Sequence, residues 1–297
     1  MNSRTILPGT FDGVHLGHRH LIQKAREIAD GTIVSVLTFN PHPDIFLGRD
    51  SKDYLLTTPD EREELLLSAG ADEVITLGFD SELQRLSPQD FFKKILLEMY
   101  NMKKIVVGED FRFGNQREGD VELLYSLSRV FDVEVFVVPS LKIGQEIVKS
   151  ERIRMLLKMG EIRKANEMLG RLYSLRGKVI KGQGLGHRLG CPTANLYVHP
   201  QKLLPRNGVY AVKVKRVNCW FDGICYIGRR PTIAEGMDIH CEVHLFDIAG
   251  DFLGETLEVS FVQSIRGERK FVSLEELSKQ IQLDIEEARH ILYNMRV

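Results

Sequence analysis

The residues best suited to chemistry are two histidines, His15 and His18, in a glycine-rich segment that reads GTFDGVHLGH from residue 9 to residue 18. Glycines let a backbone approach a ligand closely, and the free N–H groups at the start of a helix attract an anion. Imidazole groups can donate hydrogen bonds to the charge that develops when a phosphate is attacked. The segment therefore predicts a phosphate site, and the alternative is a glycine-rich loop with two surface histidines.

Strands and helices alternate around this segment in the first half of the chain. Apolar, often β-branched runs predict buried parallel strands, and apolar residues at helical spacing lie between them. This order is typical of an α/β fold with a doubly wound, Rossmann-like parallel sheet. Ligands bind such sheets at the carboxyl ends of the strands, where residues 9–18 would lie. The expected strands are residues 5–7, 33–39, 74–77, 104–107 and 133–138, and the expected helices begin near residues 21, 58 and 87.

The pattern changes after about residue 170. Residues 154–169 indicate one helix, and short apolar runs separated by Gly, Pro, Asp and Asn then follow with little helix between them. This pattern predicts a small antiparallel β-barrel, and the capping signal at residues 273–276 begins a terminal helix. We therefore expect two domains, residues 1–169 and 170–297. The expected strands of the barrel are residues 173–180, 208–214, 220–227, 242–246 and 257–262.

The composition limits the classes of partner. The formal net charge is −1, so the chain as a whole has no electrostatic attraction for nucleic acid or anionic membranes. No apolar run reaches the length of a membrane span, and the first residues do not resemble a signal peptide. We expect a cytoplasmic protein with neither kind of partner, and with weak self-association allowed. The four cysteines form no Cys-x-x-Cys pair, which favours small buried thiols over a zinc or redox site.

Four segments together resemble one protein family. GTFDGVHLGH is similar to the signature of nucleotidyltransferases with a His-x-Gly-His motif. The other three segments resemble motifs of bacterial bifunctional riboflavin kinase/FMN adenylyltransferases, or FAD synthetases. The flavin loop of that family is similar to TFNPHP at 38–43, its second nucleotide motif to GEDFRFG at 108–114, and its phosphate-binding end motif to SERIR at 150–154. The resemblance covers nearly the whole chain. It implies that AMP moves from ATP to FMN, with Mg²⁺ as cofactor, to give FAD and pyrophosphate.

The resemblance also implies which residues act in this first site. No protein nucleophile is needed, because the FMN phosphate attacks directly while His15 and His18 stabilise the reacting phosphates. Apolar rings and prolines suit a flat isoalloxazine ring, with ordinary core packing as the alternative. The implied ATP contacts are Gly9, Phe11, Asp12, Gly13, Gly17, Asp110, Ser150 and Arg154. The implied flavin contacts are Phe39, Pro41, His42, Pro43, Phe46, Phe111 and Phe113.

One segment of this site departs from the family pattern. Where the family usually has Ser-Ser-Thr, this chain has Lys149, Ser150 and Glu151. A carboxylate near a triphosphate weakens binding by repulsion between like charges, unless Glu151 points away or Lys149 or Arg152 compensates.

A second set of motifs resembles the riboflavin kinase half of the family. PTAN at 192–195 is similar to the motif in which Thr and Asn side chains hold Mg²⁺ and ATP phosphates, and Mg²⁺ prefers such hard oxygen ligands. Glu242 matches the general base that acts on the ribityl 5′-hydroxyl. A plain turn and an exposed strand carboxylate are the alternatives. The resemblance implies that Glu242 is catalytic and that Arg266 and Phe271 contact the flavin. The implied ATP contacts are Gly182, Arg188, Thr193 and Asn195. Thr193 and Asn195 are also the implied metal ligands.

Three residues of this second site differ from the family pattern. His187 replaces an arginine, for which Arg188 is a substitute, Cys191 replaces a phenylalanine, and Tyr226 replaces an asparagine. The sequence therefore predicts FAD synthesis from FMN and ATP together with phosphorylation of riboflavin. An adenylyltransferase with a weak or inactive kinase domain, and a non-catalytic flavin-sensing protein, are the alternatives. A nucleotidyltransferase for another phosphate substrate is disfavoured by the flavin-like segment and the second domain.

Overall fold

The computed structural model describes residues 3–49, 53–182, 191–229, 239–248, 250 and 252–295. The chain divides into two units, Met1–Ser150 and Glu151–Val297, each with its own core. The sequence sets the boundary between residues 169 and 170. The backbone instead packs residues 151–169 with the second unit, because α8 (Ile162–Leu169) contacts β8 (Tyr173–Ile180) and β13 (Thr256–Gly267).

The first unit is built on a five-stranded sheet with the order β3-β2-β1-β4-β5, and every neighbouring pair is parallel. The chain moves outward from β1 to β2 and β3, and then returns to the other side of β1 for β4 and β5. This reversal places the switch point of the sheet between β1 and β4, as a doubly wound fold requires. The strands are β1 (Arg4–Pro8), β2 (Ile33–Asn40), β3 (Glu73–Gly78), β4 (Met102–Gly108) and β5 (Glu134–Val138).

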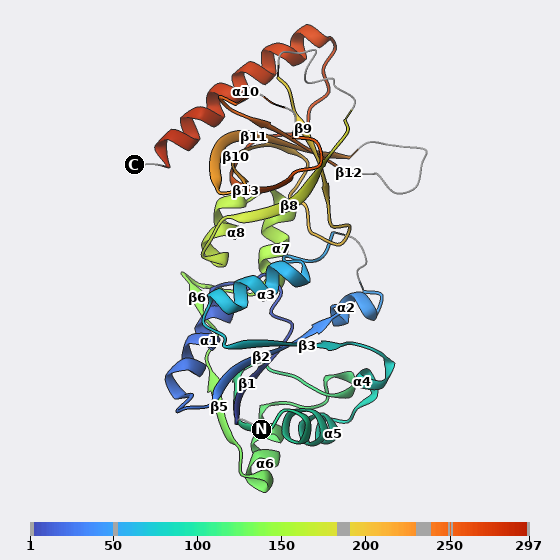
Figure 1. Cartoon of the computed structure of the whole chain (residues 1–297), viewed down its shortest axis with the longest axis vertical. Helices are drawn as coiled ribbons and strands as arrows, with labels where there is room; N and C mark the ends of the chain where they lie inside the picture. The colour runs from blue at the N-terminus through green and yellow to red at the C-terminus, as the bar shows by residue number, and fades with distance from the viewer. Residues whose placement is uncertain are drawn as a thin grey trace. The chain divides into compact units, whose positions relative to one another are not determined.

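Helices cover both faces of this sheet (Figure 1). Alternating residues of β1 point to opposite cores: Leu7 packs with α1 and α3, and Ile6 packs with η1 and α6. The predicted capping box is present, because the Thr58 hydroxyl and the Glu61 carboxylate each accept from the backbone N–H of the other. The helices are α1 (Leu16–Ile28), α2 (Pro43–Phe46), α3 (Pro59–Ser68), α4 (Ser81–Arg85), α5 (Pro88–Asp90), the π-helix η1 (Phe91–Met99), the 3₁₀ turn η2 (Asn115–Arg117) and α6 (Val121–Phe131). A hairpin of β6 (Lys142–Ile143) and β7 (Glu146–Ile147) completes this unit.

The second unit is a closed antiparallel barrel with the strand order β10-β11-β12-β9-β8-β13. Closure of the barrel leaves no free sheet edge. The sequence misses strand β9, whose first two residues, Ala194 and Asn195, are the last two of the PTAN motif. The terminal helix α10 (Leu274–Asn294) packs along β10, β11 and β13 (Figure 1). The remaining strands are β9 (Ala194–Val198), β10 (Gly208–Arg216), β11 (Cys219–Arg229) and β12 (Ile239–Leu245).

The helix expected at residues 154–169 is two helices. α7 (Ser150–Met159) ends before Gly160, whose φ of 82° lies in the left-handed region, and α8 follows. Glycine adopts this conformation without the steric cost that other residues meet, so it stops the first helix. The apolar spacing continues through the break, which is why it suggests one helix.

The cysteines are only partly as expected. Cys191, Cys225 and Cys241 are buried, whereas Cys219 is exposed at the start of β11. The prediction of four buried thiols was wrong for Cys219, because the turn before β11 places this first strand residue at the surface. Burial, followed by the charge of Glu242, raises the pKa of Cys191 to about 11.

Iodoacetamide at pH 8 is expected to label Cys219 rapidly in the folded protein and to leave the other three thiols unlabelled. Alkylation requires an accessible thiolate, and a pKa of about 11 leaves Cys191 almost entirely protonated at this pH. Mass spectrometry of proteolytic peptides measures the label at each site, and labelling in denaturant gives the reference of full reaction. Equal rates at Cys219 and Cys225 in the native protein would contradict the burial of the barrel interior.

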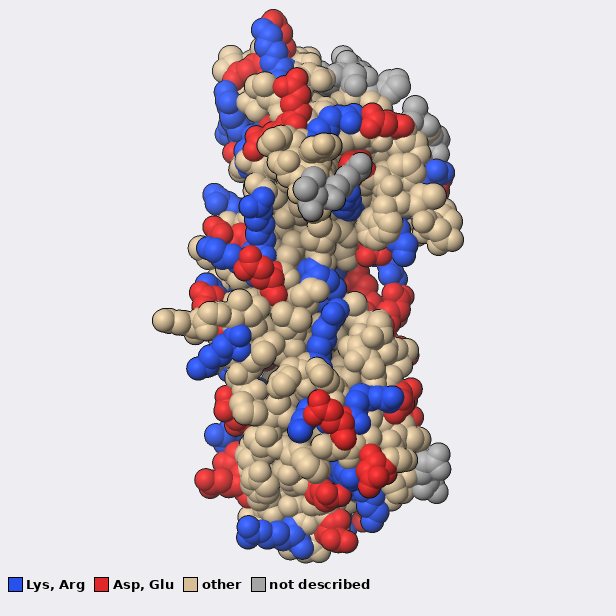
Figure 2. Space-filling view, turned by 90° about the vertical axis from the view of Figure 1, so that its left-hand side faces the viewer, with Lys and Arg blue, Asp and Glu red and all other residues tan. Residues whose placement is uncertain are grey.

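Charged side chains of both signs are scattered over one face of the molecule (Figure 2). Lys and Arg side chains are interspersed with Asp and Glu over the face that Figure 2 shows. Among the residues that the structure describes, no helix combines the length and the apolar character needed to cross a membrane.

Candidate active sites

A cavity of about 770 Å³ opens in the first unit at the carboxyl ends of the central strands. Its walls include the ends of β1, β4 and β5, so it lies at the switch point where doubly wound sheets bind ligands. This volume is within the range of small-molecule sites, roughly 300–1,000 Å³. The predicted site residues that line it are Gly9, Phe11, His15, Gly17, His18, Phe39, Pro43, Asp110, Phe111, Phe113 and Ser150.

His15 and His18 lie side by side at the cavity wall. Their ring centroids are 3.6 Å apart and their planes differ by 17°. The Nδ1 atom of His15 accepts the backbone N–H of His18 at an N···N distance of 3.3 Å, so His15 caps α1. A neutral His15 therefore carries its proton on Nε2. Gly17 makes room for this arrangement, because a Cβ at Gly17 would lie 3.1 Å from the His15 ring.

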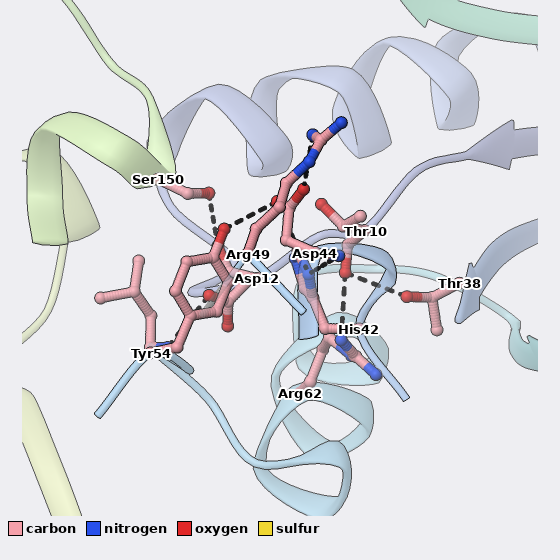
Figure 3. A network of polar contacts seen from close by, with 10 residues as sticks. Thr10, Asp12, Thr38, His42, Asp44, Arg49, Tyr54, Arg62 and Ser150 are labelled. Carbon is pink, nitrogen blue, oxygen red and sulfur yellow. Dashed lines mark hydrogen bonds and ion pairs between the residues drawn. The ribbon is translucent and has the colours of Figure 1, made fainter. Parts of the chain in front are cut away.

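Asp12 and Gly13 belong to the turn, and their hydrogen bonds hold it in place. Asp12 is fully buried, and its carboxylate accepts the N–H of Leu56 at 3.0 Å and both the N–H and the hydroxyl of Thr57 at 3.0 and 3.1 Å. The Gly13 N–H donates to Thr57 Oγ1 at 3.0 Å. The hydroxyl of Ser150 donates to the Asp12 carbonyl at 2.8 Å (Figure 3). The family resemblance implies that Asp12 and Gly13 also contact ATP, which stays a prediction; the bonds described here join the turn to the segment before α3.

Replacing Asp12 with alanine is expected to destabilise the first unit by about 3–5 kcal/mol. The change removes the bonds to Leu56 and Thr57, and it also removes the counter-charge of the buried Arg62 guanidinium. Chemical unfolding followed by circular dichroism measures the effect. Glu63→Ala, at an exposed position on the same helix as Arg62, is the matched control and is expected to change stability by less than about 0.5 kcal/mol. Equal stability losses in the two variants would show that the Asp12 bonds contribute nothing.

Aromatic rings gather at the carboxyl end of β2 and on the segments that follow β2, β3 and β4. Phe39 and Phe46 both meet the ring of Phe79 edge-to-face, with centroids 5.7 and 5.4 Å apart. Phe111 and Phe113 are stacked at 5.4 Å with an angle of 14° between their planes. Phe46 supports Phe79, and the other four rings line the cavity. Flat apolar surfaces of this kind suit a planar aromatic ligand.

His42 holds the end of the predicted flavin segment. It is buried, and its Nδ1 accepts the N–H of Asp44 at 3.1 Å, so it caps α2. The Asp44 carboxylate in turn accepts from Tyr54 at 2.8 Å and from Arg49 at 3.1 Å (Figure 3). Burial acts to raise the pKa of Asp44, but these donors and the nearby His42 outweigh it and hold the pKa below its ordinary value. Pro41, joined to residue 40 by a cis peptide bond, precedes this cap.

Lys149 pairs with Asp110 at the cavity wall. Its Nζ lies 2.6 Å from Asp110 Oδ2, and this hydrogen bond lowers the pKa of Asp110 below its usual value. Glu151 is exposed in the first turn of α7, and Arg154 is buried further along the same helix. The lysine that departs from the family pattern thus neutralises a carboxylate that lines the cavity.

In the barrel, the PTAN motif and Glu242 lie on neighbouring strands. Glu242 of β12 is in register with Asn195 of β9 and with Tyr226 of β11. The hydroxyl of Thr193 donates to Glu242 Oε2 at 3.1 Å. A Cβ at Gly182 would meet the Asn195 side chain, so glycine leaves room for the amide in this position. A hydroxyl, an amide and a carboxylate are therefore gathered in one place.

This donor set fits Mg²⁺ better than a transition metal. Its atoms are hard oxygens, and Mg²⁺ takes few protein ligands because it keeps waters and substrate phosphates in its shell. Within the described part of the chain, no cluster of three or more His, Cys, Asp or Glu side chains could hold a metal. If Thr193 and Asn195 bind Mg²⁺, as the family resemblance implies, phosphate oxygens and water would supply the other ligands.

The predicted kinase flavin residues, Arg266 and Phe271, lie where β13 meets the terminal helix. The Nε of Arg266 donates to both carboxylate oxygens of the buried Asp284 on α10 at 2.9 Å, and its guanidinium lies 5.5 Å from the centre of the Phe271 ring. Tyr226, which replaces the family's asparagine, donates to Glu268 at 2.9 Å. Arg188 and His187 lie outside the described residues.

Comparisons with known proteins agree on both halves of the chain. The family model described as FAD synthetase matches residues 2–152, and the model described as riboflavin kinase matches residues 169–292. Proteins named bifunctional riboflavin kinase/FMN adenylyltransferase are similar along most of the chain. The relative from Haemophilus influenzae is 37% identical over 95% of this chain and 92% of its own length, and that from Escherichia coli is 35% identical over 93% and 88%.

A solved structure has the same fold over the whole chain. It is described as a macrolide-efflux protein from Streptococcus pneumoniae, and it is 33% identical with a TM-score of 0.88 over 97% of this chain and 95% of its own. The two matched family models, in this order, together with relatives of this identity and coverage, leave one assignment. The chain belongs to the family of bifunctional riboflavin kinase/FMN adenylyltransferases.

Proposed function

We propose that the chain carries out both steps from riboflavin to FAD: phosphorylation of riboflavin by ATP in the second unit, and adenylylation of FMN by ATP in the first. The observation that carries the proposal is the stacked pair His15 and His18 on the wall of a cavity that is also lined by aromatic rings. The names of the relatives in Haemophilus influenzae and Escherichia coli support the same two activities.

In the adenylyl transfer, an oxygen of the FMN phosphate attacks the α-phosphorus of ATP, and the bond from this phosphorus to pyrophosphate breaks. The chain supplies position and charge stabilisation rather than a nucleophile. His15, whose Nδ1 already accepts from the backbone of His18, would present its Nε2–H to the phosphate oxygens. His18 would act as a second donor beside it.

The other residues of the first site are proposed to hold the two substrates. The nucleotide would lie among Gly9, Phe11, Gly17, Asp110 and Ser150. Asp12 and Gly13 would complete this set of contacts, and their bonds to residues 56–57 hold the turn. A role for Arg154 at a phosphate stays a prediction. The residues proposed for the isoalloxazine ring are Phe39, Pro43, Phe79, Phe111 and Phe113, with Pro41, His42 and Phe46 shaping their segment.

In the kinase reaction, Glu242 would accept the proton of the ribityl 5′-hydroxyl as that oxygen attacks the γ-phosphorus of ATP and ADP leaves. The hydrogen bond from Thr193 orients the carboxylate. Thr193 and Asn195 would hold Mg²⁺, which when bound neutralises charge on the phosphates. Contacts of Gly182 and Arg188 with ATP, and of Arg266 and Phe271 with the flavin, stay predictions.

The proposed setting is the cytoplasm, where ATP is available and where buried thiols stay reduced. The proposed partners are the small molecules ATP, riboflavin, FMN and FAD. Weak self-association, and the lack of nucleic-acid and membrane partners, stay predictions from the sequence.

Incubation of the purified chain with ATP and Mg²⁺ tests the proposal. One reaction receives riboflavin and the other receives FMN, and chromatography separates the flavins. FAD from FMN, and both FMN and FAD from riboflavin, are the expected products. FAD from FMN without any phosphorylated riboflavin would restrict the activity to the first unit and implicate His187, Cys191 and Tyr226. Flavin binding without turnover in either reaction would favour a sensing protein.

A further inference from the structure

Arg62 is a buried arginine that points toward the two segments of the adenylyltransferase site. It lies in the first half of α3 and is only 3% exposed. One guanidinium nitrogen donates to the carbonyl of Thr10 at 3.2 Å, and the other donates to the carbonyl of Phe39 at 2.9 Å. Thr38 also donates to the Thr10 carbonyl, at 3.0 Å (Figure 3).

The two carbonyls belong to different walls of the cavity. Thr10 is part of the nucleotide turn, residues 9–13, and Phe39 is part of the flavin segment, residues 38–43; both residues line the cavity. The planar guanidinium can bind two carbonyls at once in a fixed geometry, which a single ammonium cannot do. The guanidinium thus adds a rigid link between the two segments, beside the bond from the Thr38 hydroxyl and the last bond of the β1–β2 ladder, from the Gly9 N–H to the Leu37 carbonyl at 2.9 Å.

Burial of a charged guanidinium is unfavourable unless the group is paired and hydrogen-bonded. Burial lowers the pKa of Arg62, and the charge of Asp12 acts in the opposite direction. Asp12 also fixes Leu56 and Thr57, which lead directly into α3. The nucleotide turn is therefore attached at two points, to the segment before α3 through the Asp12 carboxylate and to α3 itself through the Thr10 carbonyl.

We propose that Arg62 is a positioning residue for adenylyl transfer, which sets the nucleotide turn and the flavin segment at the separation that the reaction requires. This inference rests on the proposed function of the first unit. The attacking phosphate oxygen and the α-phosphorus are carried by two substrates that bind to these two walls. A displacement of about 1 Å between reacting groups can lower a rate roughly 100-fold, so the fork acts on the rate through the distance between the walls.

Kinetics of Arg62→Met and Arg62→Lys test this inference. For each variant we would measure kcat and KM for FAD formation with ATP and with FMN varied, the unfolding midpoint, and the riboflavin kinase rate of the same preparation. Arg62→Met is expected to lower kcat roughly 10- to 100-fold, with an unchanged kinase rate. Arg62→Lys keeps the buried charge but not the fork, so it is expected to retain more stability while kcat stays at least several-fold below that of the unchanged protein.

Arg4→Met is the matched control. Arg4 is also a part-buried arginine, which bonds to Glu73 at 2.6 Å and to the Tyr100 carbonyl at 3.1 Å, but it lies at the amino end of β1, away from the cavity. It is expected to lower stability without lowering kcat of the folded fraction.

Three results would overturn the inference: an unchanged kcat in folded Arg62→Met, a kcat loss no larger than that of Arg4→Met, or full recovery of kcat in Arg62→Lys. If the unchanged protein itself forms no FAD from FMN, the proposed function fails first, and this result is distinct from the other three.

Discussion

Replacing His18 with alanine is expected to lower the rate of FAD formation from FMN about 10²- to 10³-fold, the usual cost of removing one donor to a developing phosphate charge. His18 lines the cavity and stacks on His15 at 3.6 Å, so its loss also removes the support of the second imidazole. The kinase rate is expected to stay within about twofold of the original, because Glu242 and the PTAN motif belong to the other unit.

The measurement is turnover of FMN and of riboflavin by the same preparation, with ATP and Mg²⁺ at saturation. His20→Ala is the matched control, because His20 is exposed on the same helix two residues further along. It is expected to leave both rates unchanged. Equal losses of both activities in His18→Ala would contradict the assignment of the two reactions to two separate sites. An unchanged rate of FAD formation would show that His18 takes no part in adenylyl transfer.

The fold of the first unit is readily predicted from the sequence because its central strands are buried on both faces. Runs such as residues 33–39 are mainly apolar, and the helices between them carry capping signals that the structure confirms at Thr58 and Glu61. The glycine-rich turn then has only one location, the carboxyl end of the first strand. The fold therefore predicts the position of the histidines before any ligand is considered.

The supports of this site could not be predicted in the same way. Arg62 bonds to two backbone carbonyls, and any residue type at positions 10 and 39 supplies a carbonyl, so no pattern in the sequence identifies its partners. Asp12 stands inside a motif that suggests a ligand contact, and only the structure shows that the segment at residues 56–57 occupies its oxygens. The motif thus identifies Asp12 as a residue of the turn, and the structure adds the bonds by which this residue holds the loop.

The barrel shows a different limit. Strand β9 is only five residues long and begins inside the PTAN motif, at Ala194, so its apolar signal is too short to separate from the motif. Yet this strand places Asn195 beside Glu242 in register. The sequence links the two residues only by resemblance to a family, whereas the antiparallel pairing of β9 with β12 gives the physical reason that they meet.

Replacing Glu242 with glutamine is expected to lower the rate of riboflavin phosphorylation about 10²- to 10⁴-fold, the range that a positioned general base contributes. Glutamine keeps the shape of the side chain and an oxygen that can still accept from the Thr193 hydroxyl, so the packing of the barrel is retained. The amide cannot take up the proton of the 5′-hydroxyl. FAD formation from added FMN is expected to be unaffected, which makes this variant the converse of His18→Ala.

Glu258→Gln provides the control for the loss of a carboxylate from the barrel. Glu258 lies on β13, and its ion pair with Arg176, at 3.8 Å, is partly exposed, so its contribution to stability is expected to be below about 1 kcal/mol. Both kinase and adenylyltransferase rates should stay close to those of the unchanged protein. A kinase rate in Glu242→Gln that equals that of Glu258→Gln would show that Glu242 is not the base. A selective loss of the kinase rate in Glu242→Gln would instead show that Glu242 acts as the base in the unchanged protein. Tyr226, which lies in register beside Glu242 and is bonded to Glu268, would then not prevent this role.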